Sequence, residues 1–527
     1  MVAVQSQAAP HGALKSGRTA YPYYVLALLT FANFFNYLDR QLISILAESL
    51  KADLGLDDAQ LGFLYGTLFA ALYSIFGLSV GRLADNVSQP RLLGVGLALW
   101  SGMTALSGFA FNFASLAMAR LGVGVGEATA NPCSHALIAE YFPVERRASA
   151  YAIYLAAIYL GGGASLVIGG YILQHWVELT AEFGVIGALR PWQGAFLLAG
   201  FPGVILAVLI FFIRDPRRTT GILPVSTRPW AEFLGSLMDL TPVFSLLRRG
   251  APVARTAAIT LAIAAVVALL CWLTGQIQQW LALGLVVFAM LGFALRIRAN
   301  DGPLFTLTFG TRSFRWLVSG MAITACIQHA TLFWAVPYAM RVMHMAPGAA
   351  GGTIGIILAV GGGGGVILGG IVGDRLRRRH QSAAAVMTLG SLGLSVPLAL
   401  VAFTTADIRL FLIALWGFAF VQNCWSPSAA AVVQELVLPR MRATGAATFS
   451  MLIIVVTLAC GPYLVGVISE VSGSLSAGVL ALYALTPFAV ALLLAGVRTV
   501  ASDIASKGGR AAKAGEPQTD FETVKIS

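Results

Sequence analysis

The sequence RLGVGVGEATANPCSH, from Arg120 to His135, places a cation and a carboxylate inside an otherwise apolar segment. The whole segment, 115–142, is long enough to cross the hydrocarbon core of a bilayer, which is about 30 Å thick. On a helix, Arg120, Glu127 and Asn131 share one stripe, beside three glycines that permit close helix approach. Because each charge costs about 2.5–3.5 kcal/mol at bilayer depth, the stripe should face partners or water, not lipid. The pattern predicts a solute or ion pathway; the alternative is a buried Arg–Glu pair that only fixes helix packing.

The composition indicates a polytopic membrane protein. Of the 527 residues, 58% are hydrophobic and 11% are charged, whereas soluble domains carry about 25% charged residues. The net charge of +11 could suggest nucleic-acid binding, but the basic residues lie in short loops between apolar spans, which is a topology signal. We therefore expect no nucleic-acid partner. The five cysteines lie inside apolar spans without a CxxC pair, so we expect neither disulfides nor a metal site.

The apolar spans fall into two sets of six, separated by a linker that carries two more. Most lysines and arginines lie in loops assigned to the cytoplasm, and only Lys51, Arg190, Arg341 and Arg409 lie in loops on the other side. This asymmetry predicts an inner-membrane protein with both termini in the cytoplasm. The predicted divisions are 1–213 (six-helix bundle), 214–314 (linker with an amphipathic interfacial helix at 230–249 and two extra membrane helices), 315–500 (six-helix bundle) and 501–527 (disordered tail).

The two halves repeat each other in sequence. GRLADN begins at Gly81 and GIVGDR begins at Gly370, each after the second span of its half. Six residues separate Glu140 from Arg147, and six also separate Glu435 from Arg442. A parallel six-plus-six repeat is the architecture of major facilitator transporters, so we expect an all-α integral membrane fold of two six-helix bundles plus an inserted helix pair.

Several motifs resemble those of known transporter families. The segments at Gly81 and Gly370 are similar to the loop motif of the major facilitator superfamily, although the first copy lacks its later basic residues. NYLDR at 36–40 and RxxxGxGEA at 120–128 resemble the spinster family of lipid transporters. That resemblance implies a lipid transporter in which Asp39, Arg40, Arg120 and Glu127 serve proton coupling and binding of an anionic group.

The first span adds a second group of polar residues at membrane depth. Asn33, Asn36, Tyr37 and Arg40 share one helical face, with Asp39 on its flank. Four ionisable groups in one bundle predict a shared hydrated cavity. Because burial and neighbouring arginines act in opposite directions on the proton affinity of a carboxylate, we hypothesise that Glu127 and Asp39 carry coupling protons. Asp39 could instead pair only with water or with another helix.

The second half is expected to line the cavity with uncharged residues. Spans 316–340 and 410–433 carry amides and aromatic rings but no charged residue. One charged wall facing one apolar, aromatic wall suits an amphiphile with an anionic head. His329 could titrate, or it could be an ordinary packing residue. The predicted substrate contacts are Arg40, Arg120, Asn33, Asn36, Tyr37, Asn131, Gln328, His329, Trp334, Gln422 and Asn423.

The repeated loop motifs predict a cytoplasmic gate. Asp85 and Asp374 sit at cytoplasmic helix ends, where pairing with the N-terminus of a helix from the other half is favourable by about 0.3–1 kcal/mol. We expect Asp85 near the start of the span at Arg442, and Asp374 near the start of the span at Arg147. The predicted gating residues are Asp85, Asp374, Glu140, Arg147, Glu435 and Arg442.

Enzymatic function is not predicted. HExxH, G-x-S-x-G and nucleotide-binding loop motifs do not occur, and we expect no cofactor. The prediction is a monomeric, proton-coupled, alternating-access transporter whose partners are membrane lipids, protons and an amphiphilic substrate such as a lysophospholipid or a sphingosine-phosphate-like lipid. The alternatives are a proton-coupled carrier of small organic anions and a drug–proton antiporter.

Overall fold

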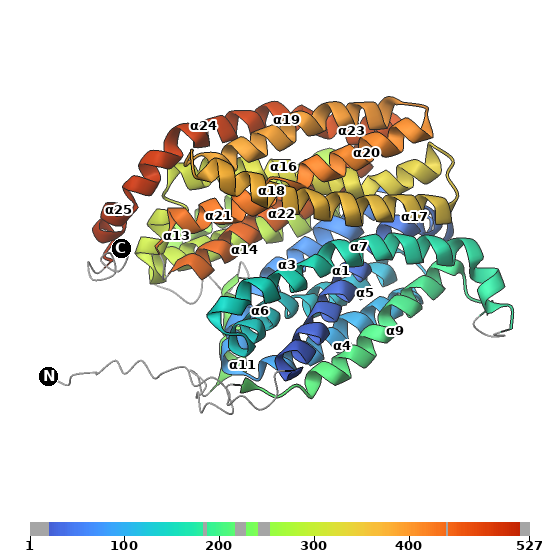
Figure 1. Ribbon diagram of the computed structural model, residues 1–527, viewed down its shortest axis with the longest axis horizontal. Coiled ribbons are helices and arrows are strands. Elements are labelled where there is room, and N and C mark those ends of the chain that lie inside the picture. Colours follow the sequence, from blue (N-terminus) through green and yellow to red (C-terminus); the bar gives the residue numbers. More distant parts are fainter. Residues whose placement is uncertain (1–19, 183–186, 217–227, 241–252, 439–440, 517–527) are drawn as a thin grey trace.

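The computed structural model describes residues 20–182, 187–216, 228–240, 253–438 and 441–516, and every regular element in these ranges is a helix. The helices form two groups that lie side by side, the first blue to green and the second yellow to red (Figure 1). The start of the first helix and the last helix lie toward one end of the molecule, here named the terminal end, and the opposite end is named the far end. In the described ranges, 11 helical segments are long and apolar enough to cross a membrane, in agreement with the predicted all-α membrane fold.

The helices fall into a first bundle, an insert and a second bundle. The first bundle contains α1 (Ala20–Leu54), α2 (Asp58–Gly62), η1 (Phe63–Thr67), α3 (Leu68–Asn86), α4 (Gln89–Ser107), α5 (Phe113–Glu127), α6 (Ala130–Tyr141), α7 (Val144–Thr180) and α9 (Pro191–Phe211). The insert contains α11 (Pro229–Leu240), α13 (Val253–Thr274), α14 (Ile277–Asn300) and α15 (Gly302–Leu307). The second bundle contains α16 (Arg312–Arg341), α17 (Pro347–Ile356), η2 (Ile357–Gly362), α18 (Gly363–Arg377), α19 (Ala383–Thr404), α20 (Ile408–Asn423), α21 (Ser426–Leu436), α22 (Arg442–Ser472), α23 (Leu475–Ala481), η4 (Leu482–Leu485) and α24 (Thr486–Ala505), followed by α25 (Lys507–Lys513).

The segment 115–142 is broken where a continuous helix was predicted. α5 ends at Glu127 and α6 begins at Ala130. The ring of Pro132 carries no N–H, so it cannot donate to the carbonyl four residues earlier and the helix is interrupted there. The second bundle repeats the break between α20 and α21, where Pro427 follows Ser426. Both breaks place the last residue of a helix, Glu127 or Asn423, beside a local turn at membrane depth.

The ends of the predicted linker helix and of the predicted tail differ from expectation. α11 covers Pro229–Leu240 of the predicted interfacial helix, and the remainder lies outside the described residues. The prediction of a disordered tail from residue 501 is wrong over 501–513. α24 continues to Ala505, and α25 packs against α15 with Ala511 fully buried. Small residues give α25 a face that fits closely against its neighbours, which the polar composition of the tail concealed.

Glycines close the far end of both seams between the bundles. Along α7 and α17, a Cβ atom on Gly163 would lie 2.6 Å from the carbonyl oxygen of Gly355, so the two helices touch backbone to backbone. In the other seam, a Cβ on Gly62 or Gly66 would collide with the backbone of α22. Only glycine allows such close crossing. The bundles are therefore in direct contact at the far end on both sides.

Candidate substrate and ion pathway

The centre of the first bundle holds an ion pair between two different helices. Nη2 of Arg40, on α1, donates to Oε2 of Glu127, the last residue of α5, at 2.7 Å. The Glu127 side chain is fully buried, whereas the Arg40 side chain is 15% exposed. Gly126, next to Glu127, allows α4 to approach so closely that a Cβ there would lie 2.6 Å from the carbonyl oxygen of Gly96. This packing fixes the depth at which the carboxylate is held.

Two further ionisable groups complete the cluster. The carboxylate of Asp39 accepts a hydrogen bond from the Thr104 hydroxyl at 3.1 Å and interacts electrostatically with both Arg120 and Glu127. Asp39, Arg120 and Glu127 are each at most 2% exposed. In the described part of the chain, Oδ1 of Asp39, Nη1 of Arg120 and Oε1 of Glu127 have no hydrogen-bond partner. Buried charged groups with spare hydrogen-bonding capacity are costly unless a proton, water or ligand reaches them.

Aromatic rings surround the exposed side of the Arg40 guanidinium. The centroids of Phe69 and Tyr37 lie 4.2 Å and 4.9 Å from its Cζ atom. Tyr73 is farther, at 6.0 Å, and its hydroxyl accepts from Nδ2 of Asn131 at 2.9 Å. Asn131 is exposed to solvent although it lies at membrane depth. Tyr37, Arg40 and Asn131 therefore lie around one accessible part of the cluster, and their contact with a substrate stays a prediction.

One predicted contact residue of α1 serves packing in this structure. Asn33 donates to the backbone carbonyl of Tyr154 at 2.8 Å, which links α1 to α7. Asn33 and Asn36 are both nearly fully buried. Because its amide is bonded to α7, Asn33 makes a structural contact in this structure, whereas the substrate contact of Asn36 stays a prediction.

The second bundle carries a neutral counterpart of the ion pair. Nε2 of Gln328, on α16, donates to Oδ1 of Asn423, the last residue of α20, at 2.8 Å. Trp425 donates to Oε1 of Gln328, and Tyr159 of α7 donates to the same Asn423 oxygen at 3.4 Å. Gln422 donates to the Thr324 carbonyl. Gln328 and Asn423 thus form an amide pair, which the hydroxyl of Tyr159 joins to the first bundle, while Gln422 makes a separate contact between α20 and α16.

The aromatic part of the second wall does not line the site. Trp334 is fully buried and donates to the carbonyl oxygen of Pro462 at 3.0 Å. Its neighbour Phe333 is also buried and stacks on Tyr65, with ring centroids 4.0 Å apart. We therefore correct Trp334 from a substrate contact to a contact between α16 and α22. His329, by contrast, is exposed, and its ring lies close enough to Arg40 for their charges to interact.

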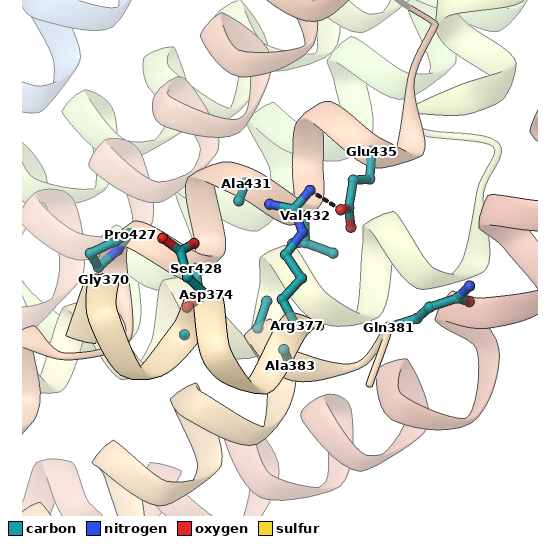
Figure 2. A pocket seen from close by; sticks show the side chains of 12 residues that line it. Gly370, Asp374, Arg377, Gln381, Ala383, Pro427, Ser428, Ala431, Val432 and Glu435 are labelled. Carbon is teal, nitrogen blue, oxygen red and sulfur yellow. Dashed lines mark ion pairs between the residues drawn. The ribbon is translucent and has the colours of Figure 1, made fainter. Parts of the chain in front are cut away.

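The predicted gating residues take different partners in this structure. Arg377 forms an ion pair with Glu435, within a pocket that Asp374 also lines (Figure 2). Arg147 donates to the backbone carbonyl of Phe142 at 2.9 Å, within its own bundle. The described contacts do not include one between Asp374 and the helix start at Arg147, and the gating role of these residues stays a prediction.

The other predicted gating residues are Glu140, Arg442 and Asp85. Glu140 is exposed. Arg442, at the start of α22, interacts electrostatically with Lys507 of α25. The side chain of Asp85 lies outside the described residues.

The far end carries an ionic bridge between the bundles that sequence analysis missed. Arg341, on α16, donates to Glu48 of α1 at 2.7 Å and to both carboxylate oxygens of Asp58, at 2.6 Å and 2.8 Å. Asp58 is 1% exposed and also accepts from Lys51 and from Ser469 of α22, each at 2.8 Å. The signal in the sequence was that Lys51 and Arg341 are among the few basic residues outside the cytoplasmic loops.

Exposure along the two central helices changes from one end to the other. On α1, Ser44 donates to the carbonyl of Phe333 and Glu48 contacts Arg341, so this face meets α16 near the far end. On the same face, exposure increases toward the terminal end. The side chains there are first partly exposed (Gln41, Tyr37, Phe34 and Thr30) and then exposed (Ala27 and Tyr23). The opposing face of α16 follows the same order, from buried Ala330 and Ile327 to exposed Ser319, Trp316 and Arg312. The two central helices are therefore in contact at the far end and accessible at the terminal end.

Comparison with known proteins agrees with this architecture. The chain is 26% identical over 448 residues to an MFS-type efflux pump of Mycolicibacterium smegmatis, covering 84% of each chain. Over shorter stretches it is 33% identical to a probable L-galactonate transporter of Escherichia coli (35% of this chain and 37% of the relative). It is 28% identical to protein spinster of Drosophila melanogaster, over 37% of this chain and 30% of the relative.

A solved structure shares the fold. A bacterial homologue of the human lysosomal transporter spinster, in an inward-facing and unoccupied conformation, aligns with a TM-score of 0.66 at 20% identity, covering 94% of this chain and 96% of that one. The sequence profile described as Major Facilitator Superfamily matches residues 29–453. A match over that much of the sequence, with a site between two helical bundles, identifies the chain as a member of the major facilitator superfamily of membrane transporters.

Proposed function

We propose that this protein is a proton-coupled, alternating-access transporter of an amphiphilic anion, with a lysophospholipid-like or sphingosine-phosphate-like lipid as the substrate class. The observation that carries the proposal is the Arg40–Glu127 pair, buried on the Glu127 side and accessible on the Arg40 side. Protonation of Glu127 would neutralise the carboxylate and free the Arg40 guanidinium for an external anion. A proton and an anionic headgroup would then enter the site together or replace each other.

Asp39 and Arg120 extend this exchange. Their charges balance those of Arg40 and Glu127, so the empty site is neutral when both carboxylates are ionised. Because Asp39 interacts with Glu127 as well as with Arg120, a proton on one carboxylate lowers the repulsion felt by the other. We assign the coupling protons to Glu127 and Asp39, and the anion contacts to Arg40 and Arg120.

The accessible face of α1 supports an amphiphile. The polar groups Gln41, Tyr37 and Arg40 lie deep in the site, and Phe34, Ala27 and Tyr23 follow toward the terminal end. A single-chain lipid could place its headgroup at Arg40 and its hydrocarbon chain along this apolar stretch. The amides of Gln328 and Asn423 would meet hydroxyl groups of the head.

The bridge at Arg341 supports alternating access. It joins α1 and α2 of the first bundle to α16 and α22 of the second, so these contacts would break when the far side opens. We propose that the terminal end faces the cytoplasm, where the basic loops lie, and that the structure corresponds to the cytoplasm-facing state. In the opposite state, Asp85 and Asp374 would engage the helix starts at Arg442 and Arg147.

A small organic anion is the second candidate. It is favoured by the hydrogen-bonding wall of Gln328 and Asn423 and by the galactonate relative. Uptake of labelled lysophosphatidic acid and of labelled galactonate into proteoliposomes, each with and without an inward-directed proton gradient, tests both. We expect the lipid to be moved faster with the gradient; transport of galactonate alone would establish the second candidate, and gradient-independent lipid transport would remove proton coupling.

A further inference from the structure

The inserted helix pair has one inner and one outer member. No residue in the apolar window of α13 is buried, so α13 faces the surroundings over its length. α14 lies inside it, and a Cβ on Gly284 would lie 2.6 Å from a Val267 methyl group. α13 therefore packs on α14, and α14 packs on the transporter.

The inner face of α14 contacts both bundles at once. Val286 of α14 belongs to one apolar cluster with Ala71 of α3 and with Met451 and Val455 of α22. Met290 and Phe293, one and two turns farther along α14, pack against the same cluster. α14 thus lies along the seam between α3 and α22.

One backbone carbonyl joins the three parts of the chain. The carbonyl oxygen of Ala459, in α22, accepts a hydrogen bond from Nε2 of Gln279 at 3.0 Å and another from the Thr67 hydroxyl at 2.8 Å. Gln279 is only 3% exposed. The insert, the first bundle and the second bundle meet at this point.

The contacts on the two sides of Ala459 differ. Toward the far end, α22 touches the first bundle directly, at the glycines Gly62 and Gly466. Toward the terminal end, α3 and α22 remain in contact, and the α14 cluster packs against both of them. The apolar contacts continue through Ile297 to Leu438 and Met441, just before α22. α11 packs on α3 and on α14 in the same region. The insert therefore covers the part of the seam that lies toward the terminal end.

We propose that the inserted hairpin is a lateral seal. It closes the α3–α22 seam to membrane lipid while the central site faces the terminal end, so a hydrocarbon chain can pass between site and bilayer only through the opposite seam. In this opposite seam, α7 and α17 touch near the far end. Toward the terminal end, both α7 and α18 have exposed apolar side chains, including Ile153, Leu155, Ile367 and Ile371. The route for the chain rests on the proposed function, whereas the seal itself does not.

A covalent tether tests whether this seam must open. In a background without the five native cysteines, Val286→Cys and Val455→Cys are cross-linked through two disulfides with a short bis-methanethiosulfonate reagent, and lysolipid transport is measured in proteoliposomes. We expect the tethered protein to keep at least half of the rate of the untethered double variant. A more than tenfold fall that reductant reverses would show that the hairpin must leave the seam, and would overturn the proposal.

A matched tether across the opposite seam provides the control. Gly162→Cys with Leu358→Cys joins α7 to η2, where a Cβ on Gly162 would lie 3.3 Å from a Leu358 methyl group. Since the bundles must part there during the cycle, this tether should stop transport. Its inhibition shows that the reagent can trap the protein, so that retained transport in the first tether is informative.

Photolabelling tests the seal without transport. Proteoliposomes containing a phospholipid with a diazirine near the end of its acyl chain are irradiated, and labelled peptides are identified by mass spectrometry. We expect labels on α13 and α18 and at least tenfold fewer on the segment of α22 containing Met451 and Val455; equal labelling would overturn the seal. If no lysolipid is transported at all, the proposed substrate fails, but the labelling pattern still decides whether the seam is closed.

Discussion

The Arg40 guanidinium and the Glu127 carboxylate meet at 2.7 Å through Oε2, and among the described residues Oε1 of Glu127 has no hydrogen-bond partner. The pair joins α1 to the broken end of α5, so any change in the charge of Glu127 acts directly on the contact between these helices. In the second bundle, Gln328 of α16 pairs with Asn423 at the end of α20, and neither side chain can change charge at physiological pH. Of these two pairs, only Arg40–Glu127 can therefore respond to protons.

Glu127→Gln should uncouple transport from protons. The amide keeps the size of the side chain but cannot bind or release a proton, so uptake driven by a proton gradient should fall at least tenfold, while exchange of substrate across the membrane persists. Uptake and counterflow in proteoliposomes measure the two activities. Glu178→Gln, at an exposed position of α7, is the matched control and should change neither; unchanged gradient-driven uptake in Glu127→Gln would remove Glu127 from coupling.

Arg341→Gln should favour opening of the far side. It removes the cation that holds Glu48 and Asp58 together across the bundles. For a partly exposed bridge we expect a loss of about 1–3 kcal/mol, below the cost of breaking a fully buried pair. Distances between spin labels on the far ends of α1 and α16 report the change, and a distribution identical to that of the native protein would contradict the role of the bridge.

Gly351→Ala should disturb the α7–α17 crossing. A Cβ there collides with the carbonyl oxygen of Leu166 and lies 3.1 Å from the Cα of Gly170. We expect a lower thermal midpoint and slower transport, because backbone groups cannot move aside as flexible side chains do. Gly352→Ala is the matched control, since nothing lies within 4 Å of its Cβ; it should be neutral or stabilise by up to about 1 kcal/mol through helix propensity. Equal effects of the two substitutions would contradict this account.

Lys507 should give the attachment of α25 a pH dependence at alkaline pH. Burial, and secondarily the charge of Arg442, lowers the pKa of Lys507, whose ordinary value is about 10.4. Between the lowered and the ordinary pKa the detached state binds more protons, so docking strengthens as pH rises through this interval and levels off above it. The measurement is limited proteolysis after α24 from pH 7 to pH 11. Lys507→Gln should flatten the profile, and a slope that survives this substitution would assign the effect to another group.

The neutral residues of the site were harder to predict than the charged ones. Arg120, Glu127 and Arg40 stand out because charges are rare at membrane depth, and the structure gathers them with Asp39 in one cluster. Trp334 and Asn33 carried no comparable signal. A polar or aromatic residue in an apolar span can face a cavity or a neighbouring helix. Helical periodicity alone does not identify the face of a helix that lines the cavity.

The sequence by itself determined that the chain crosses the membrane many times, that its halves repeat, and where charges enter the bilayer, because hydropathy and the cost of buried charge are local properties of a segment. Only the tertiary structure decided that Arg341 bridges Glu48 and Asp58, that Gln328 pairs with Asn423, and that α14 lies against both α3 and α22. These contacts join residues hundreds of positions apart. Their geometry depends on how the helices cross, and that is set by glycine-to-backbone contacts between helices and not by the pattern within any one of them.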